Sequence, residues 1–117
     1  MKYLAIIPAY NEGANIYDVV KNIKNSNFEF DIVVINDGSQ DNTYSEAKRA
    51  GAKVINLSNN LGIGGAVQTG YLFAYNNNYD AAIQIDGDGQ HDSKELNKLV
   101  EELEKNEAEL ESGFAGL

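Results

Sequence analysis

Four short apolar segments, separated by stretches with helical periodicity, constrain the fold of this chain more than any other feature of its sequence. The apolar segments are residues 3–7, 31–35, 53–57 and 81–85. Each is followed by a loop rich in Pro, Asn, Asp or Gly, which is typical of buried strands. Near-continuous apolar strands that alternate with helices predict a parallel sheet with helices on both faces.

Helical periodicity is clearest between the first two of these strands. Residues 16–23 carry apolar side chains at i, i+3, i+4 and i+7, the stripe of an amphipathic helix, with Asn11 or Asn15 as its cap. A second helix is expected over residues 41–50, capped by its first residue and ended by Gly51. Together with the strands, these helices predict a Rossmann-like α/β fold with about four parallel strands.

Two further helices complete the pattern. The third is expected from about residue 63 to the run of asparagines at 76–78. Its buried face is predicted to consist of Ile63, Ala66, Val67, Gly70 and Ala74. The last helix is expected to open with Asp92 or Ser93 as its cap. Its buried side chains are predicted to be Leu96, Leu99, Val100 and Leu103, with Leu110 as a further candidate.

The length of 117 residues indicates one domain, residues 1–110, followed by a short tail at 111–117. No apolar run approaches the roughly 18 residues that cross a bilayer, and the chain does not start like a secretory signal, so a cytoplasmic protein is expected. The absence of cysteine excludes disulfides and thiolate catalysis. The formal charge of −9 argues against a nucleic-acid partner, because binding phosphates takes clustered Lys and Arg.

The loops that follow the four strands are expected to meet at one edge of the sheet. They are residues 8–12, 36–39, 59–65 and 86–92. In a parallel sheet all such loops lie at the carboxyl edge, where open α/β sheets bind ligands. All four loops are polar, and the sequence therefore predicts a binding site at this edge.

Asp86 and Asp88 are the strongest candidates for a metal site in these loops. Mg²⁺ and Mn²⁺ prefer oxygen ligands and are often held by one or two carboxylates together with substrate phosphates. Asp and Gly are also common turn formers, so an ordinary polar turn around Gly87 is the alternative. The position of the pair at the ligand-binding edge favours the metal site.

The glycines at this edge do not match the common phosphate-binding loops. No Gly-Lys-Ser/Thr follows Gly62, and Val67 stands where a dinucleotide-binding loop needs a small residue. An EF-hand is excluded because His91 occupies its invariant glycine position. Gly62, Gly64 and Gly65 either let the backbone approach a neighbour or ligand at a helix N-terminus or serve packing.

Four segments in this order resemble the donor-binding half of family 2 glycosyltransferases, which has a GT-A-like fold. The segments are residues 8–12 (PAYNE), 36–39 (NDGS) with Asp41 and Thr43, 60–66 (NLGIGGA) and 86–92 (DGDGQHD). The likeness is closest to the dolichyl-phosphate mannose synthase and polyprenyl-phosphate glycosyltransferase branch, which implies a role in cell wall or glycolipid biosynthesis. The resemblance extends over nearly the whole chain, to about Lys105.

The resemblance implies a role for individual residues. The residues that line the nucleotide pocket would be Pro8, Ala9, Tyr10 and Glu12, with Asp37 receiving the base. Asp86, Gly87 and Asp88 would form the D-x-D motif that meets the ribose, the diphosphate and a Mg²⁺ or Mn²⁺ ion. The neighbours of the donor would be Gly64, Gln90 and His91. A cation fits the residues as well, because carboxylates repel a diphosphate unless a cation lies between them.

Three of these side chains also have a purely structural interpretation. For His91, a loop or capping role is favoured over a role in the site. Tyr10 either stacks on a base or anchors its own loop. Glu12 also provides a favourable charge at the N-terminus of the first helix.

The resemblance implies inverting transfer of a sugar from a UDP- or GDP-sugar to an acceptor such as a polyprenyl phosphate, which would bring the protein to a membrane surface. The family takes its general base from a second half that this chain lacks, so no catalytic residue is assigned and a truncated donor half is expected. The alternative is a non-catalytic nucleotide or nucleotide-sugar binding module. A phosphatase or phospho-receiver is disfavoured, because its Asp nucleophile would follow the first strand, where residues 8–11 read PAYN.

The fourth strand is expected to have a bare edge. In the family, further strands continue the sheet beside it, but residues 111–117 contain no β-branched run. An unpaired edge offers N–H and C=O groups to another chain. A homodimer or swapped assembly is therefore predicted.

Overall fold

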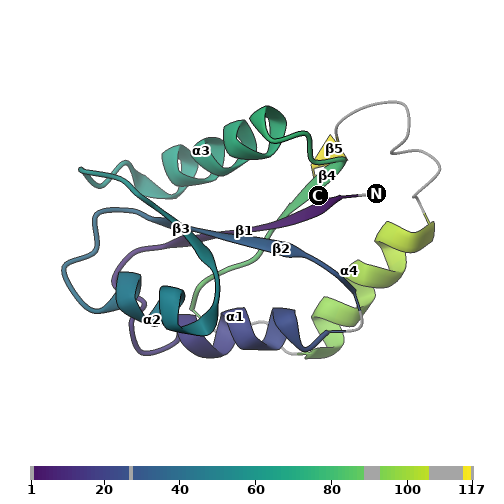
Figure 1. Cartoon of the computed structure of the whole chain (residues 1–117), viewed down its shortest axis with the longest axis horizontal. Coiled ribbons are helices and arrows are strands. Elements are labelled where there is room, and N and C mark those ends of the chain that lie inside the picture. Colours follow the sequence, from purple (N-terminus) through teal and green to yellow (C-terminus); the bar gives the residue numbers. More distant parts are fainter. Residues whose placement is uncertain (1, 27, 89–92, 106–114, 117) are drawn as a thin grey trace.

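The structure, a computed structural model, describes residues 2–26, 28–88, 93–105 and 115–116. Its sheet has five parallel strands in the order β3-β2-β1-β4-β5 (Figure 1). The strands are β1 (Tyr3–Ala9), β2 (Asp31–Asn36), β3 (Lys53–Asn56), β4 (Ala81–Gln84) and β5 (Ala115–Gly116). The helices are α1 (Ile16–Lys24), α2 (Thr43–Ala50), α3 (Gly62–Asn76) and α4 (Ser93–Lys105). The predicted α/β class and its four strands are confirmed.

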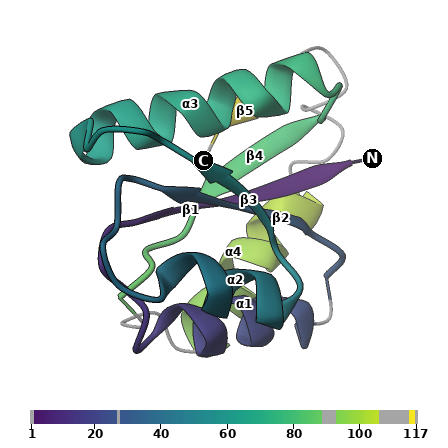
Figure 2. The same ribbon diagram turned by 60° about the vertical axis from the view of Figure 1, so that its left-hand side comes forward.

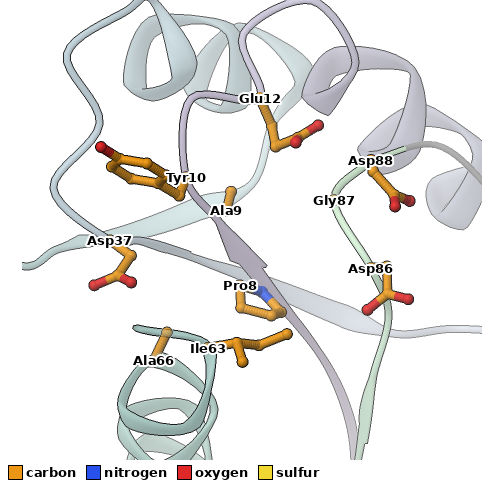
Figure 3. Close-up of a pocket in the computed structure, with 10 residues that line it drawn as sticks. All are labelled: Pro8, Ala9, Tyr10, Glu12, Asp37, Ile63, Ala66, Asp86, Gly87 and Asp88. Carbon is orange, nitrogen blue, oxygen red and sulfur yellow. The ribbon is translucent and has the colours of Figure 1, made fainter. Parts of the chain in front are cut away.

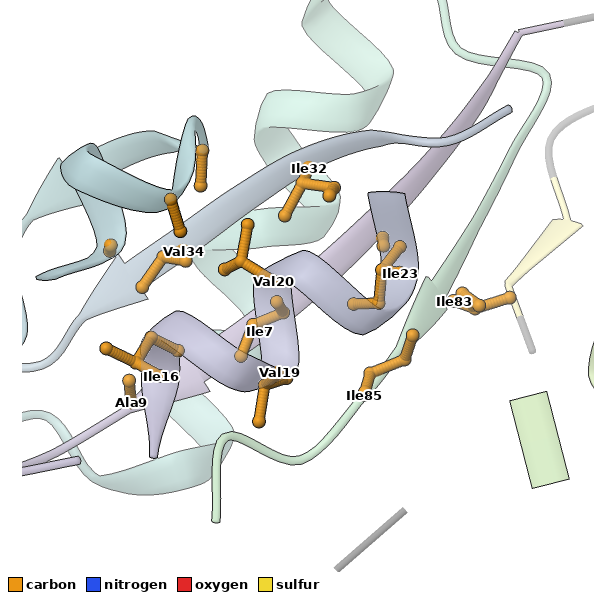
Figure 4. Close-up of a cluster of buried hydrophobic side chains, with 14 of the residues drawn as sticks. Ile7, Ala9, Ile16, Val19, Val20, Ile23, Ile32, Val34, Ile83 and Ile85 are labelled. Carbon is orange, nitrogen blue, oxygen red and sulfur yellow. The ribbon is translucent and has the colours of Figure 1, made fainter. Parts of the chain in front are cut away.

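Helices cover both faces of the sheet. Figures 1 and 2 show α1, α2 and α4 on one face and α3 on the other. Alternate residues of β1 explain this arrangement. Ala5 and Ile7 belong to the larger core cluster, which includes residues of α1 and α2, whereas Leu4 and Ile6 belong to the smaller cluster, which includes residues of α3. Figure 4 shows Ile7 among the branched side chains of the larger cluster. A strand buried on both faces reads as a continuous apolar run in the sequence.

Helix α3 lies against the sheet through small residues. Ala66, Gly70 and Ala74 are buried, and a Cβ atom on Gly70 would overlap Cγ2 of Ile6 in β1. The predicted face of this helix is therefore correct at these three positions. It is wrong at Ile63, whose side chain is 64% exposed at the start of the helix.

Strand β1 extends two residues further than predicted, through Pro8. The N–H of Ile85 donates to the carbonyl of Ile6 at 2.9 Å, so the even-numbered backbone groups of β1 face β4. Strand β4 ends at Gln84, and the nitrogen of Pro8 therefore points to where the ladder has stopped. A proline is tolerated at such a position because no ladder bond is lost.

The helix caps differ in part from the prediction. Asn15 caps α1 without a side-chain hydrogen bond. Asn42, not Asp41, occupies the cap position of α2, although the carboxylate of Asp41 accepts a hydrogen bond from the N–H of Thr43 at 3.0 Å. Gly51 ends α2 as predicted, with a φ of +96° that favours glycine.

The prediction of a bare edge beside β4 is wrong over part of its length. Ala115 and Gly116 form β5 and pair with Ala81 and Ala82. The prediction failed because it relied on β-branched residues, whereas a strand of two residues needs only backbone hydrogen bonds. The proposed basis for a swapped assembly is thereby removed at these two positions.

The strand order places a topological switch point between β1 and β4. The chain passes from β1 outward to β2 and β3, and then returns to the other side of β1 to form β4. In open α/β sheets, ligands bind outside the carboxyl ends of the strands at such a point.

None of the described helices is long and apolar enough to cross a membrane.

Candidate functional site

A pocket of about 210 Å³ lies at this switch point (Figure 3). It is lined by Pro8, Ala9, Tyr10, Glu12, Asp37, Ile63, Ala66, Asp86, Gly87 and Asp88. All eight residues that the sequence analysis assigned to a nucleotide pocket are therefore brought together around one cavity. Gly64 is not among the lining residues, and Gln90 and His91 lie outside the described residues.

The floor of the pocket depends on a close approach between β1 and the segment that follows β4. A Cβ atom on Gly87 would lie 3.1 Å from the carbonyl oxygen of Pro8 and 3.5 Å from Cβ of Ala9. Gly87 is buried, whereas Asp86 and Asp88 on either side of it are exposed. The glycine thus lets this segment lie against β1 while both carboxylates remain accessible to a ligand.

The pocket is strongly acidic. Among the described residues, its lining includes the carboxylates of Glu12, Asp37, Asp86 and Asp88 and no Lys, Arg or His. Within the described part of the chain, no group of three or more His, Cys, Asp or Glu residues could hold a metal ion. A divalent cation would therefore take two carboxylates from Asp86 and Asp88 and its other ligands from water or a bound phosphate, which is common for Mg²⁺.

Asp37 connects three parts of the site. It is only 3% exposed, and its N–H donates to the carbonyl of Ala9 at 2.9 Å. One of its carboxylate oxygens accepts a hydrogen bond from the N–H of Leu61 at 2.7 Å. Asp37 therefore holds the loop before α3 in place, and its other carboxylate oxygen has no hydrogen-bond partner among the described residues.

Tyr10 and Glu12 reach the pocket from the loop after β1. The Tyr10 side chain is 49% exposed at the pocket rim and forms no hydrogen bond with the described residues, so its ring is accessible to a ligand. Glu12 is half-buried, and its carboxylate accepts a hydrogen bond from Nδ2 of Asn15 at 3.1 Å. The carbonyl of Glu12 accepts hydrogen bonds from the N–H groups of Asn15 and Ile16 at 2.9 and 2.8 Å, so this residue also starts α1.

Ile63 and Ala66 are the two lining residues that sequence reasoning missed. Both were assigned to the core face of α3 because they share its helical periodicity. Ala66 is buried, and Ile63 projects from the first turn of α3 toward the carboxyl edge. Gly62 precedes it with a φ of +81°. A large apolar residue directly after such a glycine, at the ligand-binding edge, was the available signal.

Comparison with known proteins supports these observations. The sequence matches the glycosyl transferase family 2 profile over residues 4–115. It is 36% identical over 115 residues to the UDP-N-acetylglucosamine–dolichyl-phosphate N-acetylglucosaminyltransferase of Methanococcus voltae, covering 84% of this chain and 45% of that protein. It is 32% identical over 119 residues to the dolichol-phosphate mannosyltransferase of Pyrococcus furiosus, covering 97% of this chain and 33% of that protein. The chain thus spans less than half the length of these relatives.

Solved structures share the fold. Glucosyl-3-phosphoglycerate synthase from Mycobacterium tuberculosis, in complex with Mn²⁺, UDP-glucose and phosphoglyceric acid, superimposes with a TM-score of 0.60 at 26% identity, covering 74% of this chain and 33% of that one. A mycobacterial protein superimposes with a TM-score of 0.72 at 24% identity, covering 87% of this chain and 36% of that one, which shows a common fold. The structural neighbours of this chain are therefore GT-A glycosyltransferases.

The family match extends over nearly the whole chain, and it agrees with the parallel sheet and with the four loops that meet at its carboxyl edge. On these grounds the chain belongs to glycosyl transferase family 2.

Proposed function

We propose that this chain binds a nucleotide-sugar donor together with a divalent cation, and that it is the donor-binding part of a glycosyltransferase. The observation that carries this proposal is the pocket at the switch point, which among the described residues is lined by four carboxylates and by no basic side chain. A diphosphate entering it would be repelled unless a cation bridged the charges. UDP- or GDP-sugars with Mg²⁺ or Mn²⁺ are the ligands that fit this chemistry.

The two sides of the pocket suit the two ends of such a donor. Figure 3 shows Tyr10 and Asp37 on one side of Pro8, and Asp86 and Asp88 on the other. The aromatic ring of Tyr10 offers a surface for a base, and Asp37 offers a carboxylate oxygen to its N–H groups. Asp86 and Asp88 would hold the cation and, through it, the diphosphate.

In the reaction we propose, an acceptor oxygen attacks the anomeric carbon of the sugar, the bond to the diphosphate breaks, and the configuration inverts. When bound, the cation stabilises the negative charge that develops on the leaving diphosphate. A polyprenyl phosphate is a suitable acceptor, since it is already anionic and needs little help from a general base. Dolichyl phosphate appears in the name of the Methanococcus relative, and such an acceptor would bring the protein to a membrane surface.

A second candidate function is nucleotide or nucleotide-sugar binding without catalysis. It is favoured by the described lining of the pocket, in which side chains suited to a nucleotide and a cation are present but no catalytic residue is assigned. Incubation with a labelled UDP- or GDP-sugar and a polyprenyl phosphate separates the two. Formation of the glycolipid supports the transferase, whereas donor binding without transfer supports the binding module.

Titration calorimetry with UDP and with GDP, each with and without Mn²⁺, tests the donor site. We expect binding to require the cation and to weaken at least about tenfold in Asp88→Ala, because one of two metal-binding carboxylates is lost. The matched control is Glu101→Ala, which removes an exposed carboxylate of α4 outside the pocket. Nucleotide binding that needs no metal and is unchanged in Asp88→Ala would contradict the assignment of the acidic pair.

A further inference from the structure

Four hydrogen bonds connect the loop after β1 to the loop before α2 and to the start of that helix. Three consecutive backbone N–H groups of the first loop donate to two side chains of the second loop and to the side chain of Thr43, the first residue of α2. Their donor–acceptor pairs are Asn11 N to Ser39 Oγ at 2.8 Å, Glu12 N to Thr43 Oγ1 at 2.9 Å, and Gly13 N to Asp41 Oδ2 at 3.0 Å. In return, the N–H of Gln40 donates to Oδ1 of Asn11 at 2.9 Å.

The backbone of the first loop needs these acceptors. Asn11 has a φ of +53°, so the chain turns sharply as it leaves β1. Backbone N–H groups removed from water need a hydrogen-bond partner. A Cβ atom on Gly13 would overlap Oδ1 of the exposed Asn42 and would lie 2.9 Å from Oδ2 of Asp41, so a larger residue would force these side chains to move.

Asp41 is the centre of this connection. One of its carboxylate oxygens accepts from the N–H of Gly13, and the other accepts from both the N–H and the hydroxyl of Thr43. Thr43 is fully buried, and its hydroxyl oxygen in turn accepts from the N–H of Glu12. Burial tends to raise the pKa of Asp41, but the hydrogen bonds from the Thr43 hydroxyl and from the N–H groups of Gly13 and Thr43 lower it below its ordinary value. The carboxylate is therefore ionised at neutral pH, and its hydrogen bonds are charge-assisted.

The loop after β1 contributes two residues to the pocket. Tyr10 and Glu12 line the cavity, whereas Asp41 does not. The side chain of Tyr10 is half-exposed. Tyr10 follows the end of β1 and comes just before the left-handed turn at Asn11, so no helix or strand fixes the direction of this side chain. After Tyr10, the loop is held by the hydrogen bonds of the next three amides.

We propose that Asp41 is a positioning residue for nucleotide binding. By holding the amides of Glu12 and Gly13, directly and through Thr43, it orders the loop before the ligand arrives. A loop that is ordered in advance loses less conformational entropy on binding, and affinity is higher for that reason. This inference rests on the proposed function, because the ligand it concerns is the nucleoside diphosphate of the donor.

Two measurements on Asp41→Asn test the proposal. The asparagine amide cannot accept a hydrogen bond at both of its terminal atoms, so we expect the amides of Asn11, Glu12 and Gly13 to exchange with deuterium about tenfold faster, with α3 unchanged. In calorimetry at saturating Mn²⁺, UDP or GDP is expected to bind about three- to tenfold more weakly, while the requirement for the cation is retained. An unchanged Mn²⁺ concentration for half-maximal binding distinguishes this variant from Asp88→Ala, which loses one of the two proposed metal-binding carboxylates.

Variants of Thr43 provide the rescue, and Glu46 provides the control. Thr43→Ser keeps the hydroxyl and should bind nucleotide like the unaltered chain, whereas Thr43→Val should resemble Asp41→Asn. Glu46 lies in the same helix as Thr43, and its carboxylate pairs with Arg49 and not with the loop. Nucleotide binding should therefore not change in Glu46→Gln. If Asp41→Asn does not fold, Ser39→Ala tests the same connection through the amide of Asn11.

The outcomes separate this inference from the proposed function. Normal nucleotide affinity in Asp41→Asn, with or without faster exchange in the loop, overturns the role of Asp41 and leaves the proposed function standing. Failure of the unaltered chain to bind UDP or GDP in the presence of Mn²⁺ overturns both.

Discussion

At the scale of single residues, two tyrosines show how surroundings decide the chemistry of a side chain. Tyr10 lies at the rim of the pocket with half of its side chain exposed. Tyr79 lies just before β4, at the amino ends of the strands, and its hydroxyl donates to Oδ2 of Asp31 at 2.7 Å. Burial, and then the hydrogen bond to Asp31 and the charge of that carboxylate, raise the pKa of Tyr79 to about 12.

Alkaline titration followed by tyrosinate absorbance should therefore show one of the seven tyrosines ionising near pH 12. A raised pKa means that the folded state favours the neutral phenol. The stabilisation is fully present below the unfolded pKa of about 10 and is lost as the pH rises through the folded value. Tyr79→Phe should remove the late step and Asp31→Ala should move it to lower pH. A single transition of all tyrosines near pH 10 would contradict this prediction.

At the scale of elements, α3 connects the core to the site. It contributes Ile63 and Ala66 to the pocket, and Ala66, Gly70 and Ala74 to the contact with the sheet. It is the only described helix on its face of the sheet (Figure 2). A change in how closely α3 lies on β1 is therefore expected to alter both stability and the pocket.

Gly70→Ala should destabilise the fold by about 1–3 kcal/mol, because the added Cβ would overlap Cγ2 of Ile6 and the packed core cannot accommodate it without strain. Urea denaturation measures the change. The control is Gly64→Ala in the same helix, where an added Cβ would have no atom within 4 Å. This control should gain up to about 1 kcal/mol from its higher helix propensity. Equal stability of the two variants would show that α3 does not depend on the close approach at Gly70.

At the scale of the whole molecule, the edges of the sheet bear on assembly. Strand β5 pairs with Ala81 and Ala82 of β4, and Ile83 and Gln84 of β4 pair only with β1 among the described residues. At the other edge, β3 pairs only with β2 within the described part of the chain. Strand edges of this kind present unpaired N–H and C=O groups to other chains.

A homodimer formed through one of these edges stays a prediction. Sedimentation equilibrium over a range of protein concentrations should show a reversible monomer–dimer transition. A monodisperse monomer at every concentration would contradict it.

Much of the fold and the composition of the site could be predicted from the sequence. The strands and helices were predictable because the periodicity of apolar residues reports how each segment buries its own face. The meeting of residues 8–12, 36–39 and 86–88 was predictable as well, since loops that follow parallel strands share one edge. The eight predicted pocket residues lie around one cavity for this reason.

Only the tertiary structure decided which segments are neighbours. The order β3-β2-β1-β4-β5 places Pro8 beside Gly87, and the packing of two loops joins Gly13 to Asp41. The tertiary structure also shows that Ile63, which was predicted to lie in the core, lines the pocket, and that β5 pairs with β4. Periodicity says that a face is buried but not against which partner, because partners far apart in sequence are selected by the packing of the whole domain. The sequence by itself thus determined the elements and the residues that meet at the pocket, whereas the geometry of the pocket came from packing.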